Sequence, residues 1–128
     1  FKGMDLLAGI ALEVECDQGL VANFDPAKMR RVFRNLIRNA AEACTGRTGS
    51  RIVLSAKKSG SGVEICVSDN GPGIPEHLRD RLFQPFESFG KTNGTGLGLA
   101  TSKRIVEAHG GKILLSRSLT PVTFCITI

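Results

Sequence analysis

The sequence contains no tryptophan and no tyrosine, and aromatic residues make up only 5% of its 128 positions. Few side chains are therefore available to stack on nucleic acid bases. The formal net charge is +5, but the basic residues are scattered along the chain. A polyphosphate ligand or an acidic protein partner explains this charge at least as well as DNA or RNA does, and we expect no nucleic acid partner.

Long apolar runs are also missing, since no stretch approaches the roughly 20 residues that a membrane-spanning helix needs. The amino end shows no secretory signal pattern of basic, apolar and small residues. The four cysteines, Cys16, Cys44, Cys66 and Cys125, show neither CxxC spacing nor a dense disulfide framework. Each has apolar neighbours, so we expect buried structural thiols in a protein of the reducing cytosol.

A length of 128 residues with 41% hydrophobic side chains is typical of one soluble globular domain. No internal repeat or low-complexity linker divides the chain. We therefore expect residues 1–128 to form a single domain. The sequence starts abruptly at Phe1, so we also expect a further segment before it.

Hydrophobic periodicity predicts both strands and helices. Strands are expected at 12–16 and 20–24 as one hairpin, at 51–58 and 63–69 as a second hairpin, and at 112–116 and 123–128. Helices are expected from the Asp25-Pro26 start to Gly46, at 76–83 and at 97–109. This order predicts an α/β two-layer sandwich, in which helices cover one face of a mixed, largely antiparallel sheet.

Asn35 and Asn39 lie four residues apart on the first long helix, so their side chains project from the same face. An amide oxygen is a hard donor of the kind that Mg²⁺ prefers. The pair is thus a candidate metal site. The alternative is two solvated asparagines, because asparagine is mostly exposed in proteins.

Two glycine-rich segments are candidate ligand sites. Asp69 ends an apolar strand and precedes Asn70-Gly71-Pro72-Gly73, where glycine permits a sharp turn and a close backbone approach. A carboxylate there can accept a hydrogen bond from an exocyclic amine such as that of adenine, whereas an Asx-turn is the structural alternative. The second segment, Gly94–Leu99, opens a helix without matching a Walker or Rossmann pattern, and its backbone N–H groups suit phosphates.

The stretch 84–93 between these segments has no clear period and reads as a loop. Phe86 beside Pro85 is expected to pack, whereas Phe89 beside Gly90 is harder to bury. We interpret this loop as a lid over a nucleotide, with Lys91 able to reach a phosphate.

Four segments taken in this order closely resemble the N, first glycine, F and second glycine boxes of sensor histidine kinases. They are Asn35-Leu36-Ile37-Arg38-Asn39-Ala40, Asp69-Asn70-Gly71-Pro72-Gly73-Ile74-Pro75, Phe83-Gln84-Pro85-Phe86 and Gly94-Thr95-Gly96-Leu97-Gly98-Leu99. The resemblance spans essentially the whole chain and includes Arg104–Gly111. It implies the ATP-binding catalytic domain of a two-component kinase, with the Bergerat fold of the GHKL group.

The resemblance implies roles for individual residues. Asn39 would be the Mg²⁺ ligand with Asn35 beside it, and both are assigned to catalysis. Asp69 would anchor adenine, and the second glycine segment would form the lid hinge and hold the phosphates. The expected nucleotide-binding residues are Asn35, Arg38, Asn39, Asp69, Gly71, Gly73, Ile74, Phe86, Lys91, Gly94, Thr95, Gly96, Leu97, Gly98 and Leu99.

Asn35 also bears on the reaction type. ATP-hydrolysing relatives such as DNA gyrase have a water-activating glutamate at this position, and asparagine is no general base. This difference favours phosphoryl transfer to a protein side chain over steady hydrolysis.

The chain departs from the common pattern of this family at two places. Glu42 and Ala43 replace a usual Lys-Tyr pair, as in nitrogen-regulation-type kinases, and we expect Arg38 to supply the missing charge. Pro121-Val122 replaces the usual Gly-Thr near the carboxyl end.

The phosphoacceptor histidine is also missing, since neither His77 nor His109 has the required helical setting. We therefore expect a cytoplasmic catalytic fragment that transfers the γ-phosphate of ATP·Mg to a histidine on an upstream dimerisation domain, with a response regulator as the indirect partner. The isolated domain is expected to be monomeric and the full kinase a homodimer. The alternatives are a protein-serine kinase of the anti-sigma-factor type and a nucleotide-binding scaffold that transfers no phosphate.

Overall fold

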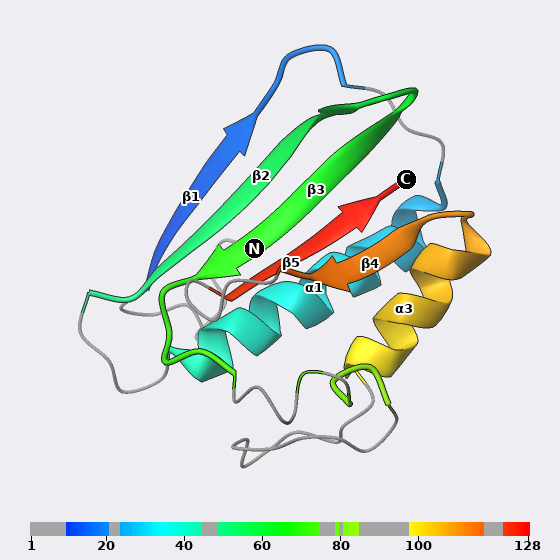
Figure 1. Cartoon of the computed structure of the whole chain (residues 1–128). Coiled ribbons are helices and arrows are strands. Elements are labelled where there is room, and N and C mark those ends of the chain that lie inside the picture. Colours follow the sequence, from blue (N-terminus) through cyan, green and yellow to red (C-terminus); the bar gives the residue numbers. More distant parts are fainter. Residues whose placement is uncertain are drawn as a thin grey trace.

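The computed structural model describes residues 10–20, 24–44, 49–74, 79, 81–84, 98–116 and 122–128. The elements in these ranges are β1 (Ala11–Cys16), α1 (Pro26–Ala43), β2 (Arg51–Ser59), β3 (Gly62–Asp69), α3 (Gly98–Ala108), β4 (Lys112–Leu115) and β5 (Val122–Thr127) (Figure 1). None of the described helices is long and apolar enough to cross a membrane.

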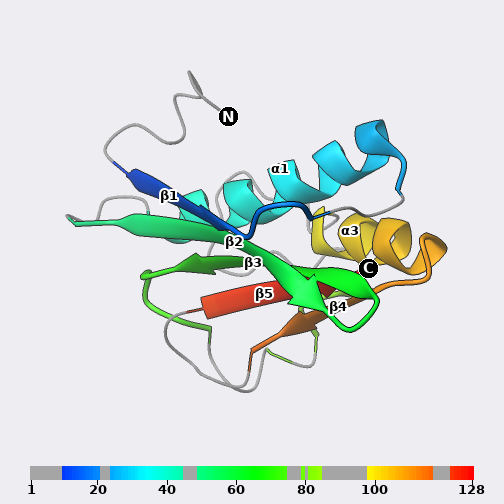
Figure 2. The ribbon, with the colours of Figure 1, turned by 90° about the horizontal axis from the view of Figure 1, so that it is seen from above.

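The five strands form one sheet in the order β1-β2-β3-β5-β4. β1 pairs with β2 in parallel, whereas the other neighbours pair in antiparallel fashion. Both α1 and α3 lie on the same face of the sheet (Figure 2). The predicted two-layer sandwich with a mixed, largely antiparallel sheet is therefore confirmed.

The start of α1 follows from its cap. The Asp25 carboxylate accepts hydrogen bonds from the backbone N–H groups of Ala27 and Lys28 at 3.0 and 3.2 Å, and Pro26 occupies the first helical turn. The predicted start is thus confirmed. The helix ends at Ala43 rather than at Gly46, which lies outside the described residues, and Cys44 is its C-cap.

The core lies between the helices and the sheet. Alternation on each strand turns one set of side chains toward the helices, and the i, i+3, i+4 pattern does the same on α1. The buried core residues are Met29, Val32, Leu36, Ile37, Ala40, Ala41, Ile52, Val67, Leu82, Val106, Ile113, Val122, Phe124 and Ile126. The opposite face of the sheet is left without a helix among the described elements (Figure 2).

Two predicted elements, the strand at 20–24 and the helix at 76–83, lie largely outside the described residues. The first predicted strand is present as β1, but its described partner is β2, and most of the proposed hairpin partner at 20–24 lies outside the described residues. The alternating pattern indicates a strand without specifying its partner, so the parallel pairing of β1 with β2 was not predicted. Of the helix expected at 76–83, only 79 and 81–83 are described, and 81–83 form a turn.

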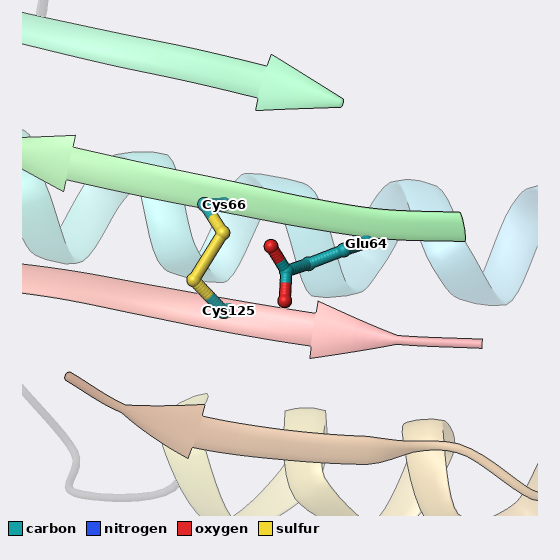
Figure 3. Close-up of side chains that lie close together, drawn as sticks. All are labelled: Glu64, Cys66 and Cys125. Carbon is teal, nitrogen blue, oxygen red and sulfur yellow. A yellow bond between two sulfur atoms is a disulfide. The ribbon is translucent and has the colours of Figure 1, made fainter. Parts of the chain in front are cut away.

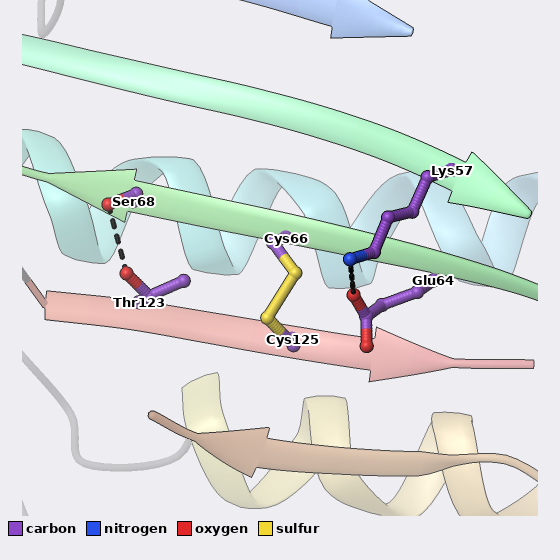
Figure 4. Close-up of a disulfide and its surroundings, with 6 residues drawn as sticks. All are labelled: Lys57, Glu64, Cys66, Ser68, Thr123 and Cys125. Carbon is purple, nitrogen blue, oxygen red and sulfur yellow. Dashed lines mark hydrogen bonds and ion pairs between the residues drawn. A yellow bond between two sulfur atoms is a disulfide. The ribbon is translucent and has the colours of Figure 1, made fainter. Parts of the chain in front are cut away.

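The expectation of four buried thiols is wrong. Cys44 is buried as a free thiol, but Cys16 is exposed on the edge strand β1. Cys66 on β3 and Cys125 on β5 form a disulfide (Figure 4). These two positions face each other directly in the antiparallel register. Their pairing depends on a contact between strands that are 59 residues apart, which local composition does not reveal.

Candidate functional site

Asn35 connects the middle of α1 to the first turn of α3. Its side-chain nitrogen donates to the backbone oxygen of Gly98 and to the hydroxyl of Ser102, each at 3.2 Å. The Ser102 hydroxyl in turn donates to the Gly98 oxygen at 2.8 Å. A carbonyl oxygen only accepts hydrogen bonds, so the amide nitrogen of Asn35 must face α3. The amide oxygen is consequently the end of this side chain that is available as a ligand.

Asn39 lies one turn further along the same face of α1 and is partly exposed. Both residues lie within α1, so their four-residue spacing places them on one helix face, as predicted. Arg38 lies beside this face and is largely exposed, and its guanidinium forms an ion pair with Glu42 at 3.3 Å. Part of the Arg38 charge is thus already balanced by a residue on the next helical turn.

Asp69 ends β3 inside the core layer, with only 4% of its surface exposed. Its carboxylate accepts a hydrogen bond from the backbone N–H of Gly71 at 2.9 Å. Gly71 has no room for a side chain, since a Cβ there would lie 2.8 Å from that carboxylate oxygen and 3.1 Å from the backbone oxygen of Ala43. Gly71 therefore permits the turn that fixes the buried carboxylate against the end of α1.

The turn after Asp69 and the described end of the second glycine segment, Gly98, both lie against one row of α1 residues. Asn35, Asn39 and Ala43 are spaced by four, so they form one row along about 12 Å of the helix. The start of α3 contacts this row at Asn35, and the turn after β3 contacts it at Ala43. The fold thus brings together the predicted metal pair and parts of both predicted ligand segments.

The turn after β3 has a brace that the sequence reasoning missed. The Asn70 side chain accepts a hydrogen bond from the backbone N–H of Arg51 at 2.8 Å and donates to the backbone oxygen of Gly49 at 2.9 Å. Asn70 therefore ties the turn to the beginning of β2. An Asn-Gly pair after a strand indicates a turn, but it gives no sign of this partner.

Ser102 is the second residue that the sequence reasoning missed. It is completely buried on α3, between the buried residues Ala100 and Val106. A serine at an otherwise apolar, inward-facing helix position was the available signal, because buried hydroxyls require hydrogen-bond partners.

The remaining predicted site residues divide into two groups. Gly73, with φ +86°, and Ile74 follow the Asp69 turn, and Leu99 packs against the core at the start of α3. Phe86, Lys91, Gly94, Thr95, Gly96 and Leu97 lie outside the described residues, as does the proposed lid at 84–93 except for Gln84.

Comparison with known sequences gives a consistent result. A model of the family described as "Histidine kinase-, DNA gyrase B-, and HSP90-like ATPase" matches residues 24–128. The C4-dicarboxylate transport sensor protein DctB of Rhizobium meliloti is 36% identical over 86% of this chain and 18% of its own length. The sensory histidine kinase/phosphatase NtrB of Salmonella typhimurium is 39% identical over 70% of this chain and 28% of its own length. The chain thus spans less than a third of either relative.

Solved structures agree with these sequence relatives. The catalytic domain of histidine kinase ThkA superposes with a TM-score of 0.82 at 33% identity, covering 94% of this chain and 78% of that one. A structure of ThkA in complex with response regulator protein TrrA superposes with a TM-score of 0.74 at 31% identity, covering 93% of this chain and 34% of that one.

Proposed function

Because this chain belongs to the histidine kinase-, DNA gyrase B- and HSP90-like ATPase family, and within it to the catalytic domains of sensor histidine kinases, we propose that it binds ATP with Mg²⁺ and transfers the γ-phosphate to a histidine on a separate helical domain. The fold and the ATPase family are those of a two-component kinase. We propose the roles of the individual residues, Mg²⁺ as the metal and a histidine as the phosphoryl acceptor.

The observation that carries this proposal is the row on α1 that joins the two glycine segments. A buried carboxylate, Asp69, lies near one end of the row, where Gly71 contacts Ala43. Gly98, the last glycine of the second segment, lies at the other end against Asn35. A nucleotide has the matching polarity, with N–H donors on its base and anionic phosphates at its far end. We therefore assign the base to the Asp69 end and the phosphates to the Gly98 end.

The donor set at the phosphate end fits Mg²⁺. The Asn35 amide is held with its nitrogen toward α3, which leaves an oxygen as the ligand atom, and Asn39 offers a second amide on the same face. Bound Mg²⁺ would neutralise charge on the phosphates as the phosphoryl group leaves. The protein residues would position ATP, since catalysis of phosphoryl transfer consists mostly of alignment and charge stabilisation.

Each glycine segment has a separate task in this proposal. Asp69 accepts a hydrogen bond from the amino group of adenine, and Gly71 keeps that carboxylate in place. The start of α3 presents backbone N–H groups and the positive end of its helix dipole to the phosphates. Asn35 lacks the basicity to activate water, so the phosphoryl group passes to a protein acceptor rather than to solvent.

We also propose the partners and the place of this reaction. The acceptor histidine belongs to a helical dimerisation domain, and a response regulator receives the phosphoryl group in turn. ThkA, whose catalytic domain this chain resembles, was solved with the response regulator protein TrrA, which supports a partner of that class. We place the domain in the cytoplasm, where ATP is supplied.

Labelled ATP and Mg²⁺, supplied together with a helical acceptor domain from the same kinase, test this function. We expect acid-labile label on the acceptor histidine. Transfer to a serine would indicate the anti-sigma-factor type of kinase, and ATP binding without transfer to any acceptor would indicate a scaffold module. Either result would overturn the proposal.

The adenine assignment has its own test. Asp69→Asn should weaken ATP binding by about tenfold or more, because a hydrogen bond to a charged group contributes about 1.5–3 kcal/mol. Ser68→Ala, one residue earlier on the opposite face of β3, is the matched control and should bind ATP normally. Unchanged affinity in Asp69→Asn would show that the adenine pocket lies elsewhere.

A further inference from the structure

The face of the sheet opposite α1 and α3 carries a row of cross-strand pairs between β3 and β5, and the cysteine pair lies within it. Ser68 and Thr123 share a hydrogen bond at 2.9 Å on one side of the cysteines. Glu64 forms an ion pair with Lys57 of β2 at 3.3 Å on the other side (Figure 4). The neighbours of Cys66 and Cys125 on this face are thus polar, so these cysteines do not serve as small apolar core residues.

The register brings the two sulfur atoms together whether or not they are bonded. Cys66 and Cys125 are directly opposite, with Cα atoms 4.1 Å apart, close to the ~4.5 Å of a non-hydrogen-bonded antiparallel pair. The backbone pairing of β3 and β5 continues on both sides of them. Reduction of the disulfide would therefore leave two thiols facing each other on a preformed surface.

Glu64 adds a third donor to this pair. It precedes Cys66 by two residues, so its side chain lies on the same face of β3. A carboxylate oxygen of Glu64 and the sulfur atoms of Cys66 and Cys125 all lie within 4.8 Å of one another (Figure 3). Among the described residues this is the one such group of three potential metal ligands. Glu64 forms its ion pair with Lys57 through Oε1. The carboxylate has a second oxygen, Oε2, beside it.

We propose that Cys66, Cys125 and Glu64 of the reduced chain form a binding site for a thiophilic divalent cation of the Zn²⁺ class, and that the disulfide is the closed state of this site. Two thiolates and one carboxylate are a ligand set that Zn²⁺ accepts, with water in the fourth position. All three residues are partly exposed, so a cation can reach them from the solvent. The three side chains lie on the face of the sheet opposite the helix layer that holds the proposed nucleotide site (Figure 3).

The disulfide and the metal-bound form exclude each other because both use the sulfur atoms of Cys66 and Cys125. Reduction by a small-molecule thiol breaks the Cys66–Cys125 bond, adds two electrons and two protons to the protein, and leaves that thiol as its own disulfide. Metal binding then releases the two thiol protons to solvent without any change in oxidation state. Oxidation by a small-molecule disulfide reverses the first step and prevents metal binding. The site therefore links metal occupancy to the thiol redox state.

Titration of the chain with Zn²⁺, before and after reduction, tests this proposal. The reduced chain, freed of excess reductant, should take about one equivalent of Zn²⁺ from a chromophoric chelator, and the oxidised chain should take none at this site. Substitution of Co²⁺ should give a thiolate-to-cobalt charge-transfer band in the reduced chain. Bound Zn²⁺ should also protect Cys66 and Cys125, but not the exposed Cys16, from alkylation when each peptide is measured by mass spectrometry.

Variants of single ligands complete the test. Cys66→Ser and Cys125→Ser should remove the stoichiometric binding, and Glu64→Gln should weaken it by roughly tenfold or more. Cys16→Ser is the matched control and should bind Zn²⁺ as the parent chain does. The Glu64→Gln and alkylation results remain decisive if a cysteine variant fails to fold. Equal alkylation of Cys66 and Cys125 with and without Zn²⁺, or full binding in Cys66→Ser, would overturn the proposal.

Discussion

The side-chain amide of Asn35 on α1 donates a hydrogen bond to the hydroxyl of Ser102 on α3 across 3.2 Å. Ser102 is completely buried, and its own proton goes to the backbone oxygen of Gly98, one turn earlier on α3. The amide of Asn35 is therefore held by a backbone acceptor and by a buried hydroxyl whose proton is already donated to that same acceptor. The packing of α1 on α3 thus decides which end of the Asn35 amide serves as a ligand.

Removal of the Ser102 hydroxyl tests this relationship. In Ser102→Ala, Asn35 keeps its bond to Gly98 but loses one of two restraints, and we expect a loss of about 1 kcal/mol in stability. We expect nucleotide affinity to fall about fivefold in Mg²⁺ and to remain unchanged in a chelator, as titration calorimetry would measure.

Thr101→Ala is the control for that experiment, since its hydroxyl lies about 100° around the helix from Ser102. Equal losses of affinity with and without Mg²⁺ in Ser102→Ala would indicate a general packing defect. The orienting role of Ser102 would then be wrong.

Gly71→Ala should disturb both stability and nucleotide binding. The added Cβ would lie 2.8 Å from the Asp69 carboxylate and 3.1 Å from the backbone oxygen of Ala43, so the turn has to shift. Overpacking of this kind costs typically about 1–3 kcal/mol. We expect a lower free energy of unfolding in urea together with weaker ATP binding, because the displaced group is the proposed adenine acceptor.

Gly60→Ala provides the contrast for Gly71→Ala. Gly60 has φ +57° in the β2–β3 turn, but a Cβ there meets nothing within 4 Å. The strained backbone should cost about 1–2 kcal/mol of stability while ATP affinity stays unchanged. If both variants lost stability alone, Gly71 would have no part in positioning Asp69.

Local sequence patterns were sufficient for most of the fold. The Asp25-Pro26 cap, the periodicity of α1 and the alternation in β2 and β3 each depend on neighbours in the chain, and these elements match the structure within a few residues. Partners distant in sequence were harder to predict. The parallel pairing of β1 with β2 was not predicted, because strand alternation specifies a face but not a partner.

The same distinction applies to the site. Asn35 and Asn39 were predictable as a pair because helical spacing alone puts them on one face. The support from Ser102, which is 67 residues from Asn35, and the disulfide between Cys66 and Cys125 require the tertiary arrangement of two elements. The individual residues were visible in the sequence, but their contacts were not.

Reduction of the Cys66–Cys125 disulfide should destabilise the fold. The cross-link joins residues 59 apart in sequence, and closing a loop of this length removes roughly 4 kcal/mol of chain entropy from the unfolded state. We expect reductant to lower the free energy of unfolding by about 2–4 kcal/mol, measured by urea denaturation in the presence of a chelator. The Cys66→Ser/Cys125→Ser double variant should unfold at the same urea concentration with and without reductant. If the oxidised and reduced parent chains had the same midpoint, the disulfide would contribute no stability.

Asn35→Asp separates the donor role of this residue from its proposed ligand role. Aspartate keeps the size and offers stronger oxygen ligands to Mg²⁺, but its ionised carboxylate has no proton to donate to the Gly98 oxygen. A carboxylate there would place two acceptors against each other in a partly buried contact. We expect a loss of about 1–3 kcal/mol in unfolding free energy and weaker ATP binding despite the added charge.

Asn35→Ala, which removes both functions without adding an acceptor, should be less destabilised than Asn35→Asp and equally impaired in Mg²⁺-dependent binding. Tighter Mg²⁺-ATP binding by Asn35→Asp with undiminished stability would show that the amide nitrogen has no essential acceptor on α3.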